Sequence, residues 1–244
     1  MSRHALAAPL ALATLMFVSA CTSGAPAPAP SASSSPGTAD QDSAAAAYVA
    51  IGDSYTAGPG IDPADTEQPT CFRSDGNWPN LLAEDEGMTL DDVSCSGATT
   101  RSAIDGLGST VPSQLEALGE ETRLVTVGIG GNDGALFTSL LQSCSRDGGS
   151  CGRYVDQQAP EVLAQTSANV ADLLGQVRDR APQARIVLVG YLRLAPESGT
   201  CDLLGVPASA ADDARRIEQG LEDALARAAV AADVTFVSMR TASQ

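Results

Sequence analysis

The sequence predicts an α/β protein with three layers, in which a five-stranded parallel sheet lies between helices. The first observation is a set of short, continuous apolar runs without polar alternation, which is typical of parallel strands buried on both faces. These runs cover residues 47–51, 124–127, 186–189 and 234–237, with a weaker candidate at 89–95. The second observation is that helical periodicity separates the runs, and alternating strands and helices favour right-handed crossovers.

Two long helices are expected, and each follows a proline that would stand in its first turn, where the missing N–H is tolerated. The apolar positions recur every three or four residues, so that each helix has one buried face. They are Leu163, Thr166, Val170, Leu173 and Val177 after Pro160, and Ala210, Ala214, Ile217, Leu221, Ala224 and Ala228 after Pro207.

The N-terminal region is interpreted as a targeting segment and a tether. Residues 1–20 have a short basic start, an apolar stretch and a small-residue end, as in a secretory signal peptide. Val18-Ser19-Ala20-Cys21 resembles a bacterial lipobox, which implies a lipidated Cys21 and a lipoprotein on the outer face of the cell membrane. Ordinary secretion is the alternative. Residues 21–46, rich in Ala, Pro and Ser, predict an extended linker, and residues 47–244 the folded domain.

Charge and histidine content restrict the classes of function. The 244 residues carry 30 acidic and 14 basic side chains, a net charge of −16, which argues against nucleic acid as a partner. No cysteine and histidine cluster has zinc spacing, and the glycine motifs of nucleotide-binding sites are incomplete, so no metal or cofactor is predicted. The only histidine is His4, within the predicted signal peptide.

Three small, glycine-rich turns follow predicted strands. They are Gly52-Asp53-Ser54, Ser96-Gly97-Ala98 and Gly130-Gly131-Asn132-Asp133. Because strand ends of a parallel sheet meet at one edge, a serine hydroxyl, a bare glycine N–H and an asparagine amide could together stabilise an oxyanion. Each residue also has an ordinary structural reading: Ser54 and Asn132 as helix caps, and Gly97 as a turn glycine.

Taken in order, the three turns resemble the motifs of the SGNH hydrolases, the GDSL lipase/esterase family, from about residue 47 to the end of the sequence. The resemblance implies a flavodoxin-like α/β/α fold and a serine esterase without a cofactor. It also implies that Ser54 is the nucleophile, and that the Ser54 and Gly97 N–H groups and the Asn132 side chain form the oxyanion hole. The expected substrates are small-molecule or lipid acyl esters, and the expected state is a monomer.

The histidine that activates the serine in this family has no counterpart in residues 47–244. Asp53 and Asp133 are close in the motifs, but an ordinary carboxylate is a weak base toward serine. Two readings remain: a hydrolase whose sequence stops before its base, with the chain as given inactive or very weak, or an inactive binding module with the same fold. A carbohydrate acetylesterase is a further alternative for the substrate.

Five cysteines remain when Cys21 is assigned to the lipid. The expected disulfides join Cys71 to Cys95 and Cys144 to Cys151. Because five is an odd number, one cysteine, Cys201, is left without a partner in an exported protein. The resemblance to secreted actinobacterial members implies a third disulfide, between the loop of Cys201 and a C-terminal segment. The missing partner and the missing base therefore favour the interpretation of an incomplete sequence.

Overall fold

The structure is a computed structural model that describes residues 47–67, 69–144, 148–199 and 207–242, with side chains omitted for 148–150. The predicted signal peptide, the predicted lipidation site Cys21, the predicted linker and Cys201 lie outside the described residues.

Five parallel strands form one sheet in the order β2-β1-β3-β4-β5. The strands are β1 (Tyr48–Gly52), β2 (Leu90–Asp92), β3 (Leu124–Gly128), β4 (Arg185–Val189) and β5 (Thr235–Val237). β1 and β3 pair along their whole length, with Gly52 opposite Gly128 at the carboxyl end. The predicted fold class is confirmed, and each apolar run has become a strand within one residue of its expected ends, except that the weak candidate at 89–95 is shorter.

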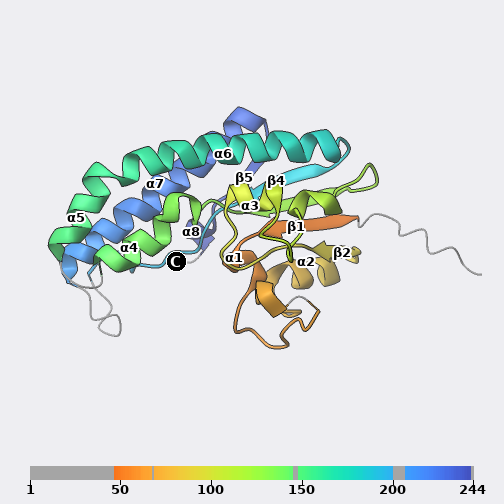
Figure 1. Ribbon diagram of the computed structural model, residues 1–244, viewed down its shortest axis with the longest axis horizontal. Helices are drawn as coiled ribbons and strands as arrows, with labels where there is room; N and C mark the ends of the chain where they lie inside the picture. Colours follow the sequence, from red (N-terminus) through yellow and green to blue (C-terminus); the bar gives the residue numbers. More distant parts are fainter. Residues whose placement is uncertain (1–46, 68, 145–147, 200–206, 243–244) are drawn as a thin grey trace, which may run out of the picture. The chain divides into compact units, whose positions relative to one another are not determined.

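The helices are α1 (Ser54–Ala57), α2 (Trp78–Glu86), α3 (Thr100–Asp105), α4 (Leu136–Cys144), α5 (Gly148–Gln157), α6 (Ala159–Arg180), α7 (Ala208–Ala232) and α8 (Met239–Ala242). The two long helices predicted from periodicity are α6 and α7. Short 3-10 turns lie at Pro69–Cys71, Gln114–Ala117 and Asp133–Ala135. Helices lie on both sides of the sheet: α3, α6 and α7 on one side and α2 on the other (Figure 1).

The main core lies between the sheet and the long helices. Ile51 of β1, Val127 of β3 and Leu188 of β4 are fully buried and belong to one apolar cluster with Leu174 of α6 and Leu221 of α7. At ~25 cal/mol per Å² of apolar surface, burying each such side chain contributes ~2 kcal/mol. This packing fixes the carboxyl ends of β1, β3 and β4 relative to one another.

The second face of the sheet is covered unevenly. Tyr48, Ala50 and Ala83 form a small buried cluster where α2 packs on β1. Beyond α2, a groove of about 570 Å³ runs along β3 and β4, and Val187 and Val189 of β4 line it. Both valines are only half-buried, unlike their neighbours Ile186 and Leu188. The expectation of strands buried on both faces therefore holds for β1 and for most of β3, but not for β4 and the edge strands.

Two disulfides lie among the residues that the structure describes. Cys144 and Cys151 are bonded and join α4 to α5, which lie at the end of α6 and α7 farthest from β1 (Figure 1). Cys71 and Cys95 are bonded and tie the loop before α2 to the turn after β2. Both expected pairs are thus present.

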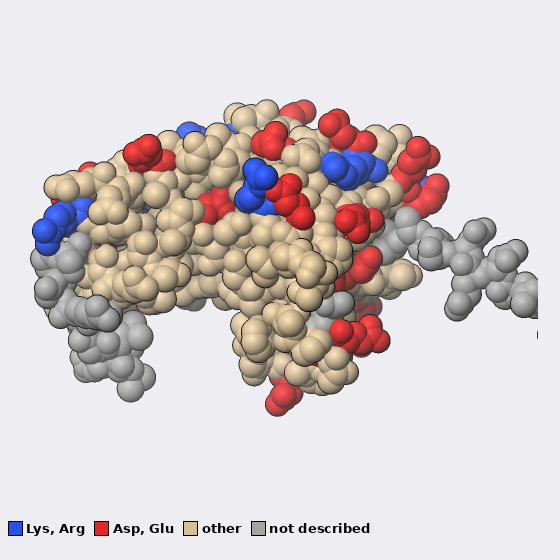
Figure 2. Space-filling model, viewed as in Figure 1, with Lys and Arg blue, Asp and Glu red and all other residues tan. Residues whose placement is uncertain are grey.

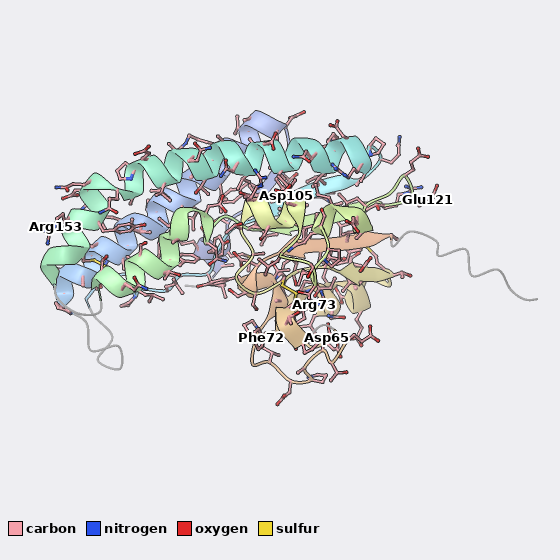
Figure 3. All side chains as sticks on the ribbon, viewed as in Figure 1. Asp65, Phe72, Arg73, Asp105, Glu121 and Arg153 are labelled. Carbon is pink, nitrogen blue, oxygen red and sulfur yellow. A yellow bond between two sulfur atoms is a disulfide. The ribbon has the colours of Figure 1, made fainter. Side chains whose placement is uncertain are left out.

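The loop before α2 is also held by an ion pair. Arg73 Nε lies 2.9 Å from the Asp65 carboxylate, and Arg73 Nη1 donates to the Ser94 carbonyl at 3.2 Å. Phe72, between Cys71 and Arg73, is 64% exposed and has a φ of 51°. Figure 3 labels Asp65, Phe72 and Arg73 together on this loop. On the face shown in Figure 2, acidic side chains gather toward the end that holds β2.

Candidate active site

Ser54 is the first residue of α1, directly after β1 and at the carboxyl edge of the sheet. The residue that caps the helix is Asp53, whose carboxylate accepts a hydrogen bond from the Tyr55 N–H at 3.0 Å. Ser54 is half-buried, and its hydroxyl makes no hydrogen bond to any other described residue. The capping role considered for Ser54 therefore belongs to Asp53, and the serine hydroxyl is left available.

Gly97 lies in the turn after β2 and has a left-handed φ of 82°, which favours glycine. Its position is exposed, and no heavy atom lies within 4 Å of where a Cβ would stand. The turn is fixed by its neighbours, because the Cys95 N–H donates to the Gly52 carbonyl at 3.0 Å and the Ser96 N–H to the Cys71 carbonyl at 2.9 Å. The Gly97 backbone is thus open to a ligand on a well-fixed turn.

Asn132 connects the three turns. Its Nδ2 donates to the Ala98 carbonyl at 3.0 Å and lies 3.5 Å from Asp53 Oδ2, at the outer limit of a hydrogen bond. Its side chain makes no capping hydrogen bond to the turn that follows. The structure therefore brings Asn132 against the residue before Ser54 and the residue after Gly97.

Asp133 has a different environment from Asn132. It is buried, and its carboxylate accepts from the Thr100 N–H at 2.8 Å, the Thr100 hydroxyl at 2.6 Å and the Asn169 amide at 3.2 Å. These bonds tie the turn after β3 to α3 and α6. Asp133 therefore serves to hold the site together.

Tyr191, in the loop after β4, contacts the turns that carry Ser54 and Asn132. Its hydroxyl donates to Asp53 Oδ2 and accepts from the Gly131 N–H at 2.8 Å. Burial raises the pKa of Asp53 to about 6, although the hydrogen bonds from Tyr191 and the Tyr55 N–H act to lower it. Burial, together with the Asp53 carboxylate, raises the pKa of Tyr191 well above its ordinary value. Tyr191 is therefore a protonated donor throughout the physiological range.

The described residues contain no group of three or more His, Cys, Asp or Glu side chains arranged to hold a metal ion. No helix within the described ranges is long and apolar enough to cross a membrane.

The family model described as GDSL-like Lipase/Acylhydrolase matches residues 50–244, a range that contains all three turns of the site. The chain belongs to this family. Within the GDSL-like family, the chain is 37% identical over 202 residues to Lipase 2 of Streptomyces coelicolor, covering 78% of this chain and 68% of that lipase.

Two solved GDSL-like structures resemble the fold. A phospholipase A1 from Streptomyces albidoflavus superposes with a TM-score of 0.70 at 28% identity, covering 79% of each chain. An extracellular lipase from Streptomyces rimosus superposes with a TM-score of 0.67 at 26% identity, covering 80% of each chain.

Sequence reasoning missed two residues that shape the site of this GDSL-like chain. Tyr191 lies 138 positions from Asp53, and Gln114, which binds the Gly52 backbone, lies 62 positions from it. Neither belongs to one of the three turns. The only available signal for Tyr191 was its place directly after a predicted strand, at Gly190-Tyr191.

Proposed function

We propose that this chain is a carboxylic-ester hydrolase that acts on acyl esters, with Ser54 as the nucleophile. The observation that carries the proposal is the meeting of three turns at Asn132, which contacts Asp53 on one side and Ala98 on the other. We infer that these contacts let the Ser54 hydroxyl, the Gly97 N–H and the Asn132 amide act on one bound carbonyl at the carboxyl edge of the sheet. Such a group of neutral donors suits an oxyanion that forms during acyl transfer.

In the proposed reaction, Ser54 Oγ attacks the ester carbonyl carbon while a general base takes the hydroxyl proton. The carbonyl oxygen becomes an oxyanion, which the Ser54 N–H, the Gly97 N–H and the Asn132 Nδ2 stabilise. Collapse of this intermediate expels the alcohol, which receives the proton, and leaves an acyl-serine. Water then attacks the acyl-serine by the same steps and releases the acid.

No described residue is free to act as the general base for Ser54. The only histidine is His4. Asp53 is occupied by Tyr191 and by the Tyr55 N–H, and Asp133 is occupied by Thr100 and Asn169. We therefore assign the general base to neither Asp53 nor Asp133, and we propose that residues 1–244 by themselves turn over esters weakly.

The proposed substrates are lipid or small-molecule acyl esters, which the names of the relatives support: a lipase of Streptomyces coelicolor and a phospholipase A1 of Streptomyces albidoflavus. Export is proposed from the apolar residues 1–20 and from the resemblance to an extracellular lipase. Attachment to the membrane through a lipid on Cys21 remains a proposal from the lipobox resemblance.

A second candidate function is an ester-binding module that does not turn over its ligand. It is favoured by the absence of histidine from residues 47–244, together with a Ser54 hydroxyl that makes no hydrogen bond to a described side chain. The two candidates differ in whether Ser54 forms a covalent bond.

The test uses p-nitrophenyl butyrate hydrolysis and labelling by a fluorophosphonate, with the labelled residue identified by peptide mass spectrometry. The esterase proposal expects slow turnover and a label on Ser54, both abolished by Ser54→Ala and unchanged by Ser109→Ala at an exposed serine. Saturable ester binding without turnover or label would favour the binding module. Turnover that survives Ser54→Ala would overturn the proposed nucleophile.

A further inference from the structure

Four residues from three loops form a closed ring of hydrogen bonds beside Ser54. The Gly131 N–H donates to the Tyr191 hydroxyl at 2.8 Å, and this hydroxyl donates to Asp53 Oδ2. The same Asp53 oxygen lies 3.5 Å from Asn132 Nδ2, and the peptide bond from Gly131 to Asn132 completes the ring. One hydroxyl thus binds the backbone before Asn132 and the carboxylate that contacts its side chain.

The aromatic ring of Tyr191 and its hydroxyl contact different residues. The aromatic ring packs edge-on against Tyr55, at 4.8 Å between centroids, and against Phe137, at 5.1 Å. These contacts use only the faces and edges of the rings, so phenylalanine would fill the same space. The hydroxyl is therefore not needed to fill the core, and both of its bonds go to the turns that carry Ser54 and Asn132.

The orientation of the Asn132 amide depends on its acceptors. Nδ2 carries two hydrogens: one donates to the Ala98 carbonyl at 3.0 Å, and the second has only the long 3.5 Å contact with Asp53 Oδ2, so this second hydrogen is the one that can turn to an oxyanion. The Asp53 carboxylate is anchored on its Oδ1 side by the Tyr55 N–H and on its Oδ2 side by Tyr191. Without the Tyr191 hydroxyl, the carboxylate can turn about its last torsion and the Gly131 N–H loses its partner.

We propose that Tyr191 is a positioning residue for the oxyanion hole, because its hydroxyl fixes the Asn132 amide through both Gly131 and Asp53. The proposal rests on the proposed esterase function, since it assigns Asn132 the role of an oxyanion donor. It adds to the site a residue from the loop after β4 that lies outside all three motif turns.

The first measurement is the rate of Ser54 acylation by p-nitrophenyl butyrate in Tyr191→Phe. Because losing a whole oxyanion donor typically costs a hundredfold or more, a misplaced donor is expected to lower this rate about tenfold, with KM within about a factor of two. Tyr48→Phe is the matched control, since Tyr48 is also buried and its hydroxyl binds Thr126 in the sheet at 2.9 Å. The control is expected to keep the wild-type rate.

The second measurement asks whether the effect passes through Asn132. In an Asn132→Ala background the amide is gone, so adding Tyr191→Phe is expected to change the rate by less than about twofold. An equal tenfold loss in both backgrounds would overturn the proposal, since Tyr191 would then act independently of Asn132. Asp53→Asn, which keeps the shape of the carboxylate, provides a second variant with an effect of the same sign.

The third measurement does not depend on catalysis. The side-chain amide of Asn132 is observed by NMR, with its signals assigned from their loss in Asn132→Ala. Tyr191→Phe is expected to speed the exchange of these two hydrogens with water at least about tenfold, and Tyr48→Phe to leave it unchanged. If the Asn132 amide hydrogens exchange at the same rate in Tyr191→Phe as in the wild type, the positioning role is overturned. If they exchange faster but Ser54 reacts with neither ester nor fluorophosphonate, only the esterase function is refuted.

Discussion

Gln114 binds both polar backbone groups of Gly52 with its one side-chain amide. Its Oε1 accepts from the Gly52 N–H at 2.8 Å, and its Nε2 donates to the Gly52 carbonyl at 3.0 Å. The side chain is 3% exposed and lies where β2 has ended, so it takes the place of a neighbouring strand beside the last residue of β1. The turn that carries Ser54 therefore begins from a residue whose backbone N–H and carbonyl are both hydrogen-bonded.

Gln114→Ala is expected to lower the free energy of unfolding by ~2–3 kcal/mol, because it leaves a buried N–H without a partner and opens a small cavity. Urea titration followed by circular dichroism measures the change. Gln165→Ala, at an exposed glutamine of α6, is the control and is expected to change stability by less than about 0.5 kcal/mol. Equal effects of the two variants would contradict this role of Gln114.

The buried Asp53 predicts a pH dependence of stability. Its folded pKa of about 6 lies above the ordinary value of 3.8, so between these values the folded chain holds a proton that the unfolded chain has released. The contribution of Asp53 to stability is therefore present below pH ~4 and is lost as the pH rises through ~6, a change of about 3 kcal/mol. Asp53→Asn removes this contribution from the pH profile.

Measuring the free energy of unfolding from pH 4 to 7 in both proteins isolates this effect. The difference between wild type and Asp53→Asn is expected to vary with pH across this window. A difference that stays constant from about pH 4 to 7 would show that Asp53 titrates at its ordinary value.

Asp133→Ala is expected to destabilise the fold by ~3 kcal/mol or more, because it removes the acceptor of three hydrogen bonds and leaves the buried Thr100 N–H unpaired. Thermal unfolding by calorimetry provides the measurement. Asp179→Ala, at an exposed position of α6, is the matched control. A loss below about 1 kcal/mol would mean that water replaces the carboxylate.

Phe72→Gly is expected to raise stability by ~0.5–1 kcal/mol. The left-handed backbone at Phe72 costs ~1–2 kcal/mol for a residue with a side chain, and its 64% exposed ring contributes little burial. Phe72→Ala is the control, because alanine removes the ring and keeps most of the backbone strain. A glycine variant no more stable than the alanine variant would contradict this explanation.

The sheet and the three turns could be predicted because their signals are local. A continuous apolar run such as Ile186–Val189 marks a buried parallel strand by composition alone, and parallel topology then brings the strand ends to one edge. Asn132 could likewise be chosen as a candidate site residue, because it lies in the turn that follows β3. The capping role considered for Ser54 was wrong because Asp53, one residue earlier, has a side chain that reaches the Tyr55 N–H.

The contacts that orient the site could not be predicted, because they join loops far apart in the sequence. Tyr191 and Gln114 are ordinary residues for the turns in which they occur, and only tertiary packing brings their polar atoms to Asp53 and Gly52. The incomplete covering of the sheet face that α2 packs on could not be predicted from the sequence either. Val187 and Val189 have the same composition signal as a fully buried strand, and yet they line a groove.

The bond between Cys71 and Cys95 has a practical consequence for this site. Cys95 stands two residues before Gly97, and the Cys71 carbonyl accepts from the Ser96 N–H, so the disulfide helps to fix the turn that carries Gly97. In a reducing cytoplasm this bond does not persist. Protein produced there would keep the helix-and-sheet core, which contains most of the apolar burial, while the Gly97 turn would rely on hydrogen bonds alone. The redox state of the production host is thus a variable that any activity measurement on this chain has to control.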